Sequence, residues 1–360
     1  TVQKMRNFLI NKKKIGKNSK VYFIADIAAN HDGSISRAKK LIKLCAKAGA
    51  DAAKFQHFKA ETIVSDYGFQ KLGKLSHQKK WKKTVFQVYK AASINMKWTK
   101  ILRDECKKNN IDFLTAPYDL KYVDEVNKYI SAFKIGSGDI TWKKIIVKIA
   151  KKNKPVILAT GASNMNEVKN SVKEIIKYNK KLVLMQCNTN YTNKIENFNY
   201  INLNVLKNYK KTFKDKIILG LSDHTPGSST VLGAIALGAM VIEKHFTDDN
   251  NRTGPDHKFS MNPKTWSEMV KSSRELELAL GGEIKKIEYN ENQSSIVQRR
   301  GVWLNKNKKK NEKLQLKDCN FLRPCPKNSL PIFNIEKYVG KRFKKDIKKN
   351  SLVTNLCLKT

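Results

Sequence analysis

Residues 217–246 read IILGLSDHTPGSSTVLGAIALGAMVIEKHF, two short apolar β-branched runs on either side of a segment typical of a helix. Near-continuous apolar strands joined through a helix indicate parallel strands that are buried on both faces. The first run leads into Ser222-Asp223-His224-Thr225, and the second ends in Glu243-Lys244-His245. This stretch therefore predicts one step of a parallel sheet with polar residues at the carboxyl ends of its strands.

The same unit recurs along the chain. Strands are expected at 21–27, 51–55, 111–115, 132–135, 155–159, 182–186, 217–221 and 240–244. Eight units suit an α/β fold of the (β/α)₈ TIM-barrel type, whose usual size is ~250 residues. We expect this barrel to span residues 1–285, with a basic N-terminal extension at 1–20. An open doubly wound sheet is the alternative.

The pattern changes after the barrel. Residues 286–297 are polar and predict a linker, and residues 298–360 contain the short strands, turns and prolines of a small second domain.

The net charge is +41, from 72 basic and 31 acidic residues. Only nine of the basic residues are arginine, the residue that phosphate and base readers favour, and the lysines are spread over the whole chain. We therefore expect no nucleic-acid partner, although the field would attract small anionic substrates. A basic polyanion-binding protein without catalytic activity is the remote alternative.

Cysteine usage and hydropathy point to the cytoplasm. None of the six cysteines forms a Cys-x-x-Cys pair, which is typical of reduced thiols. The longest near-apolar run, 231–242, is too short for a membrane span, and 8–10 is too short for a signal peptide. We expect a cytoplasmic protein without membrane contact.

Two histidines end neighbouring strands of the expected barrel. The imidazoles of His224 and His245 could converge at its mouth and hold a divalent metal such as Mn²⁺, Co²⁺, Zn²⁺ or Fe²⁺, with positions left open for substrate. The alternative is that both histidines make only local hydrogen bonds.

Two lysines leave apolar strands at the same rim. Lys54 and Lys134 would be costly to bury without an anion, so they predict a phosphate or carboxylate ligand. Thr115, Ser137 and Ser222 add hydroxyl donors, and together the set suggests a small, doubly anionic substrate. A Schiff-base aldolase would also use a barrel lysine and is the leading rival mechanism. A barrel synthase that acts on a phosphorylated aldose is a further alternative.

Three carboxylates complete the rim, those of Asp26, Asp139 and Asp256. They could activate water, bind sugar hydroxyls or neutralise the lysines, and spacing alone does not assign these roles.

The motifs resemble the sialic acid synthases, the wider nonulosonate synthase family. The matching stretches are 25–33 (ADIAANHDG), 48–56 (AGADAAKFQ), 134–139 (KIGSGD), 220–225 (GLSDHT), 243–248 (EKHFTD) and 254–261 (GPDHKFSM). The tail, through Phe321-Leu-Arg-Pro324 and 339–349, resembles the antifreeze-like (SAF) domain of that family.

The resemblance implies condensation of phosphoenolpyruvate with an N-acetylmannosamine-type amino-sugar aldose, which gives a nonulosonic acid and phosphate. It implies that His224 and His245 bind the metal, Mn²⁺ first with Mg²⁺ or Co²⁺ as alternatives. The remaining implied roles are catalysis for Asp26, Lys54, Lys134, Asp139 and His245, and substrate binding for Thr115, Ser137, Thr189, Tyr191, Ser222, Asp256 and Arg323. Arg323 would enter the site of a partner subunit, which implies a domain-swapped homodimer.

The chain departs from the family pattern at several positions. Asp26 and Asp139 stand where glutamate is usual, and Cys325 stands in place of the glycine of Arg-Pro-Gly. Our hypothesis is that the shortened carboxylates make room for a sugar other than plain N-acetylmannosamine, such as a 6-deoxy diacetamido sugar.

Overall fold

The computed structural model describes residues 7–75, 78–79 and 81–359. The chain divides into two compact units, Thr1–Gly281 and Gly282–Thr360, which are described separately.

The first unit is built on a closed barrel of eight parallel strands in the order β10-β3-β4-β5-β6-β7-β8-β9. The strands are β3 (Tyr22–Asp26), β4 (Ala52–His57), β5 (Asp112–Pro117), β6 (Phe133–Ile135), β7 (Val156–Ala159), β8 (Leu182–Cys187), β9 (Ile218–Asp223) and β10 (Val241–His245). This topology confirms the predicted (β/α)₈ TIM barrel.

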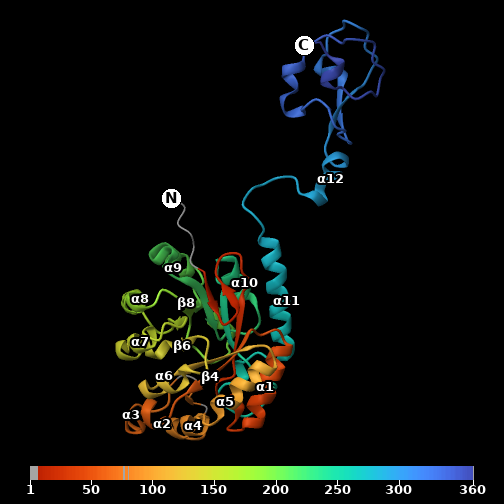
Figure 1. Cartoon of the computed structure of the whole chain (residues 1–360). Coiled ribbons are helices and arrows are strands. Elements are labelled where there is room, and N and C mark those ends of the chain that lie inside the picture. Colours follow the sequence, from red (N-terminus) through yellow and green to blue (C-terminus); the bar gives the residue numbers. More distant parts are fainter. Residues whose placement is uncertain (1–6, 76–77, 80, 360) are drawn as a thin grey trace. The chain divides into compact units, whose positions relative to one another are not determined.

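Helices follow the strands and surround the barrel (Figure 1). They are α1 (Ile35–Lys47), α5 (Trp98–Lys108), α6 (Leu120–Asn127), α7 (Lys143–Ala150), α8 (Met165–Tyr178), α9 (Val205–Phe213), α10 (Ser229–Ala236) and α11 (Pro263–Leu280). Three further short helices, α2 (Ala60–Ile63), α3 (Asp66–Leu72) and α4 (Val85–Ala92), lie in the long connection between β4 and α5.

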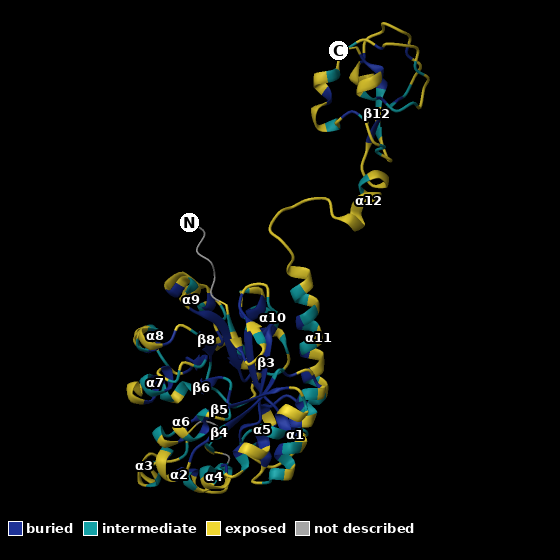
Figure 2. Cartoon of the chain, in the orientation of Figure 1, coloured by how far each residue is buried: buried dark blue, intermediate teal, exposed yellow. Residues whose placement is uncertain are grey.

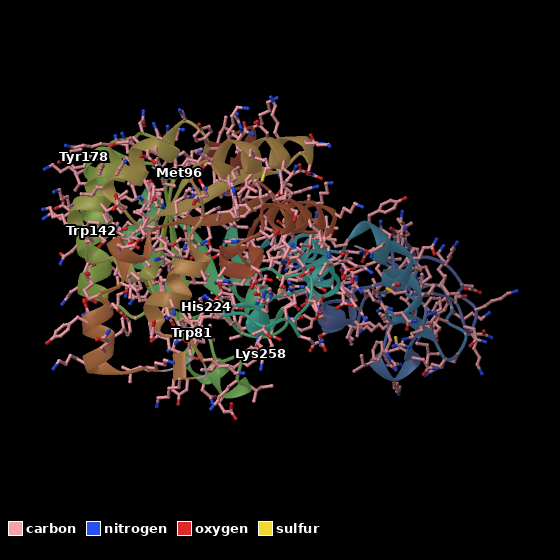
Figure 3. The ribbon with its side chains drawn as sticks, turned by 90° about the horizontal axis from the view of Figure 1, so that it is seen from below. Trp81, Met96, Trp142, Tyr178, His224 and Lys258 are labelled. Carbon is pink, nitrogen blue, oxygen red and sulfur yellow. The ribbon has the colours of Figure 1, made fainter. Side chains whose placement is uncertain are left out.

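Side-chain alternation along the strands creates two apolar layers. On β3, Tyr22 and Ile24 belong to the cluster inside the barrel, whereas Phe23 and Ala25 belong to the cluster shared with the helices. The strands are accordingly buried along their length, and the exposed positions lie on the outer helix faces (Figure 2). The side chains of Trp142 and Tyr178, for example, lie on the outer surface (Figure 3).

The basic N-terminal extension contains structure that the sequence pattern did not predict. Strands β1 (Phe8–Ile10) and β2 (Lys13–Ile15) form an antiparallel hairpin. Ile10 and Ile15 join the cluster inside the barrel. The hairpin therefore packs at the amino-terminal ends of the strands, opposite the expected site.

The second unit has its own core. Strands β11 (Gly301–Leu304) and β12 (Cys319–Leu322) pair antiparallel, and Val302, Leu304 and Phe343 are fully buried within a separate apolar cluster. The segment predicted as a linker, 286–297, is exposed but includes a short helix, α12 (Asn292–Val297), so it is not entirely irregular. A small separate domain after the barrel matches the expected architecture.

Within the described ranges, every helix is too short or too polar to cross a lipid bilayer.

Candidate active site

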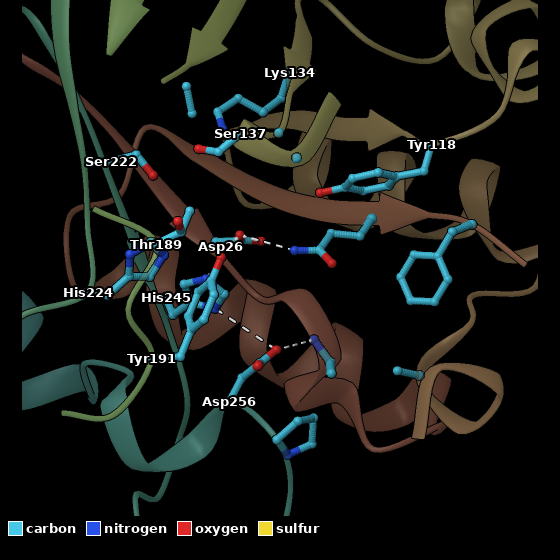
Figure 4. A pocket seen from close by; sticks show the side chains of 18 of the residues that line it. Asp26, Tyr118, Lys134, Ser137, Thr189, Tyr191, Ser222, His224, His245 and Asp256 are labelled. Carbon is cyan, nitrogen blue, oxygen red and sulfur yellow. Dashed lines mark hydrogen bonds and ion pairs between the residues drawn. The ribbon is translucent and has the colours of Figure 1, made fainter. Parts of the chain in front are cut away.

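A cavity of about 420 Å³ opens at the carboxyl ends of the barrel strands (Figure 4). Its polar lining comes from most of the strands and the loops that follow them: Asp26, Lys54, Gln56, Lys134, Ser137, Asp139, Cys187, Thr189, Tyr191, Ser222, His224, Glu243, His245 and Asp256. Polar side chains from so many strand ends indicate a functional site, because this end of a TIM barrel carries catalysis.

A buried charge cluster occupies the floor of the cavity. The Lys54 ammonium lies 2.8 Å from Asp26 Oδ2 and 3.4 Å from Glu243 Oε2. The Lys134 ammonium lies 3.2 Å from Glu243 Oε1, which also accepts a hydrogen bond from the Ser222 hydroxyl at 3.1 Å. Glu243 therefore links the two lysines, and all four charged side chains are almost completely buried.

Attraction between opposite charges in the cluster opposes the effect of burial, and the outcome differs between members. For Asp26 burial prevails and raises its pKa. Burial opposes ionisation of Glu243, but Lys134 and Lys54 outweigh it and lower the pKa of Glu243 to about 2. Burial lowers the pKa of Lys54, and the carboxylates of Asp26 and Glu243 reverse this and raise it above its usual value. For Lys134 burial prevails and its pKa is lowered. A dianionic ligand would thus meet two preformed cations in a dry environment.

His224 and His245 lie beside each other at the mouth of the cavity, as predicted. Their ring centroids are 5.3 Å apart, and the Tyr191 ring packs on His224 at 4.4 Å. The Nδ1 atom of His224 lies 2.8 Å from the carbonyl oxygen of Asn188. A carbonyl only accepts, so His224 Nδ1 carries the proton and Nε2 keeps its lone pair.

These two imidazoles suit a divalent transition metal. Burial and the neighbouring His245 lower the pKa of His224 to about 4, and burial and Lys54 lower that of His245 to about 3, so both rings are neutral. The buried Nδ1 of His245 has no hydrogen-bond partner among the described residues. No group of three or more His, Cys, Asp and Glu side chains that could hold a metal occurs within the described ranges. A metal here would have two protein ligands, with water or substrate in the remaining positions.

Two of the carboxyl groups that line the cavity have pKa values close to neutral pH. Burial raises the pKa of Asp256 to about 7 and that of Asp139 to about 6. Asp256 accepts a hydrogen bond from the Ala29 amide at 3.1 Å and lies 4.0 Å from His245. Carboxyl groups with such pKa values can exchange protons near neutral pH.

One side of the cavity is apolar and comes from the connection between β4 and α5. The side chains of Phe58, Ile63, Val88 and Tyr89 line it, and the Phe58 and Tyr118 rings pack edge to face at 6.0 Å. Methyl or acyl groups of a substrate would fit against such a surface. No sequence motif predicted that this connection belongs to the site.

Most predicted site residues meet in this cavity. Thr115 does not line it: its hydroxyl is buried, donates to the Phe55 carbonyl at 2.9 Å and contacts His57 Nδ1 at 2.7 Å. Arg323 belongs to the second unit, where it is exposed and precedes Pro324 through a cis peptide bond. Glu243 was missed as a site residue, although it follows the same alternation on β10 that placed His245 in the barrel mouth.

Residues 41–285 match the model of the NeuB family, which is well over half of the chain. The chain belongs to the NeuB family. It is 36% identical over 341 residues to N,N'-diacetyllegionaminic acid synthase of Campylobacter jejuni, covering 93% of this chain and 99% of that protein. It is 30% identical to human N-acetylneuraminate-9-phosphate synthase, covering 76% of this chain and 75% of that one.

Solved structures agree with this assignment. The N-acetylneuraminic acid (sialic acid) synthetase of Leptospira borgpetersenii superposes with a TM-score of 0.71 at 25% identity, covering 81% of this chain and 95% of that one. The spore coat polysaccharide biosynthesis protein SpsE of Bacillus subtilis superposes with a TM-score of 0.65 at 28% identity, covering 99% of both chains. The sequence resemblance to nonulosonate synthases is therefore confirmed, and this NeuB-family protein is an enzyme of that group.

Proposed function

We propose that this NeuB-family enzyme condenses phosphoenolpyruvate with an N-acylated mannosamine-type aldose, giving a nonulosonic acid and inorganic phosphate. The observation that supports it most strongly is the pairing of two buried lysines with two neutral histidines around one cavity. This combination suits a small dianion beside the carbonyl group of a second substrate.

Phosphoenolpyruvate is the dianionic partner. Lys54 and Lys134 bind its phosphate and carboxylate, and the hydroxyls of Ser137 and Ser222 donate to its oxygens. Glu243 holds the two ammonium groups in position before the ligand arrives.

The acceptor sugar lies between Tyr191, Asp256 and Asp139, with Thr189 beside it. We propose that it is a 6-deoxy diacetamido sugar. The apolar side of the cavity supports this choice, because it suits a C6 methyl and acetamido methyl groups. So does the 36% identity to a protein named N,N'-diacetyllegionaminic acid synthase.

His224 and His245 would hold a divalent cation, Mn²⁺ first with Mg²⁺ or Co²⁺ as alternatives, which would supply Lewis-acid polarisation of the sugar carbonyl.

The bond changes follow from this placement. The methylene carbon of phosphoenolpyruvate forms the new C–C bond to the aldehyde carbon, whose oxygen takes a proton and becomes a hydroxyl. Water adds to C2, and Asp26 or Asp139 accepts its proton. Phosphate then leaves with the bridging oxygen by C–O cleavage, which yields the 2-keto acid.

The second unit is an antifreeze-like (SAF) domain in this proposal. Arg323 would serve the active site of a partner subunit in a domain-swapped homodimer. We place the enzyme in the cytoplasm, where phosphoenolpyruvate is available to it.

One observation favours a second candidate, a Schiff-base aldolase. Burial lowers the pKa of Lys134, as an amine nucleophile requires. Its ion pair with Glu243 opposes that role, because a protonated lysine cannot attack a carbonyl.

Substrate exchange separates the two reactions. The enzyme is incubated with sugar and either phosphoenolpyruvate or pyruvate, and borohydride is added to parallel samples. We expect keto-acid product only from phosphoenolpyruvate and no reduced protein adduct by mass spectrometry. Product from pyruvate together with a trapped adduct on Lys134 would establish the aldolase instead.

A further inference from the structure

A second buried ion pair lies outside the cavity, between the barrel and its helices. The Lys244 ammonium lies 2.5 Å from Asp223 Oδ2 and 2.6 Å from the Thr225 carbonyl oxygen. Each side chain is 1% exposed, so the pair has no access to substrate. A pair this deeply buried costs desolvation energy and is weak evidence for stability alone, which leaves open what else it does.

The pair joins the two strands that carry the histidines. Lys244 and Asp223 are register partners on β10 and β9. His224 directly follows Asp223, and His245 directly follows Lys244. Because successive side chains on a strand point to opposite faces, the pair faces the helices while the two histidines line the cavity. The ion pair thus links the two backbones one residue before each imidazole.

Two hydroxyl groups also donate hydrogen bonds to the Asp223 carboxylate. The Thr225 hydroxyl donates to it at 2.8 Å, and the hydroxyl of Thr230, in α10, also donates at 2.8 Å. Lys244 in turn binds the Thr225 carbonyl. His224 therefore lies between two residues, Asp223 and Thr225, that are each fixed by Lys244.

We propose that Asp223 and Lys244 are positioning residues that set the separation and orientation of the His224 and His245 imidazoles, and thereby the affinity of the site for its divalent metal. The inference rests on the metal-binding role of the two histidines in the proposed function. The affinity for the metal is then controlled from the outer face of the barrel, by a pair that contacts neither metal nor substrate.

The test measures Mn²⁺ binding to the full-length protein without substrate, from the electron paramagnetic resonance signal of free Mn²⁺. The variants are Asp223→Asn and Lys244→Met, with Thr230→Val as a mild change that removes one hydrogen bond and keeps the charges. Asp112→Asn is the matched control: Asp112 is also buried and accepts hydrogen bonds from Tyr22 at 2.6 Å and Asn11 at 2.9 Å, but it lies at the other end of the barrel.

We expect Asp223→Asn and Lys244→Met to raise the Kd for Mn²⁺ by about tenfold. This is the lower end of the loss seen when a residue hydrogen-bonded to a metal ligand is removed, because this pair acts on the ligands through the backbone. Thr230→Val should raise it severalfold. Asp112→Asn should lower the melting temperature and leave the Kd unchanged.

The outcomes separate this inference from the function on which it depends. If the unmodified protein does not bind Mn²⁺, the proposed metal role itself is wrong. If it binds Mn²⁺ and the Asp223 and Lys244 variants bind equally well while melting earlier, like Asp112→Asn, the pair is purely structural and the inference is overturned. If those two variants do not fold, Thr230→Val decides alone, and an unchanged Kd for that variant overturns the inference.

Discussion

Lys134 and Glu243 form a buried ion pair across the barrel, from β6 to β10, with 3.2 Å between ammonium and carboxylate. These strands are not neighbours in the closed sheet, so the pair spans the interior beneath the cavity. The same carboxylate reaches Lys54 on β4. One glutamate thus contacts both lysines that we propose bind the substrate anion, and these contacts exist without a ligand.

Loss of Lys134 should therefore be severe. Lys134→Met leaves Glu243 with one cation fewer and removes a contact to the substrate anion. Truncation of a buried charge pair costs about 2–5 kcal/mol, so we expect kcat/KM for phosphoenolpyruvate to fall by about 30-fold or more. Steady-state phosphate release measures this. Lys144→Met, an exposed position on α7, is the control and should stay within about twofold. Near-normal kinetics in Lys134→Met would remove the lysine from the anion site.

Metal removal should abolish turnover without unfolding the protein. Chelation with EDTA should stop phosphate release and Mn²⁺ should restore it, while the far-ultraviolet circular dichroism stays constant, because the barrel core does not depend on the histidines. His224→Ala should lower the affinity for Mn²⁺ by at least about tenfold. Full activity after exhaustive chelation would contradict the metal role.

Ionisation of the Asp139 carboxyl group should lower the free energy of unfolding at high pH. Burial raises its pKa to about 6, above its usual value of 3.8, so the folded state binds more protons than the unfolded state between these values. Its contribution to stability is therefore full below pH 3.8 and is lost as pH rises through 6. Asp139→Asn should have the same stability as the unmodified protein near pH 4 and be more stable at pH 8, by on the order of 1 kcal/mol after allowance for partial exposure. Denaturant titrations at both pH values measure this, and lower stability of the variant at pH 8 would show that the ionised carboxylate is favourably engaged.

The loop that carries Asp256 depends on a close contact between Gly254 and His257. A Cβ atom at position 254 would lie 2.6 Å from His257 Cδ2. His257 cannot move freely, because it is fully buried and hydrogen-bonded to Asp32 at 2.9 Å and Thr247 at 2.7 Å. Gly254→Ala should thus displace Asp256 and raise KM for the sugar by about tenfold, with a smaller effect on KM for phosphoenolpyruvate.

The control for this change is Gly282→Ala, since a Cβ there meets nothing within 4 Å. Equal effects of the two substitutions on the sugar KM would mean that the Gly254–His257 contact does not position the loop.

The shortened carboxylates should affect the choice of sugar. Asp26→Glu combined with Asp139→Glu adds two methylene groups to the cavity lining, so we expect kcat/KM to shift toward plain N-acetylmannosamine and away from 6-deoxy diacetamido sugars by about tenfold. The ratio of kcat/KM values for the two sugars is the readout. An unmodified enzyme that already prefers N-acetylmannosamine by a large margin would refute the hypothesis.

The barrel and most of its site could be predicted because parallel strands make the relation between sequence and position simple. His224 and His245 end consecutive strands, so their proximity follows from strand order alone. Glu243 obeys the same rule, but a carboxylate in a strand has many common roles, and only its distances to Lys54 and Lys134 distinguish it.

Other features depend on packing that no local pattern encodes. Thr115 was expected in the cavity, yet its hydroxyl is buried against Phe55 and His57. The hairpin formed by residues 8–15 was not predicted, because its few apolar residues lie among lysines in the sequence. Ile10 and Ile15 are nevertheless buried in the barrel. The apolar side of the cavity comes from a long connection whose helices α2, α3 and α4 span only four to eight residues, which is short for recognition by periodicity.

The most direct test of the proposed reaction is phosphate release from phosphoenolpyruvate with Mn²⁺, measured against N-acetylmannosamine, its 6-phosphate and the 6-deoxy diacetamido sugars. We expect release that requires both metal and sugar, fastest with a diacetamido sugar, and one nonulosonic acid formed per phosphate. A folded, Mn²⁺-loaded enzyme that releases no phosphate with any of these sugars would contradict the proposed condensation.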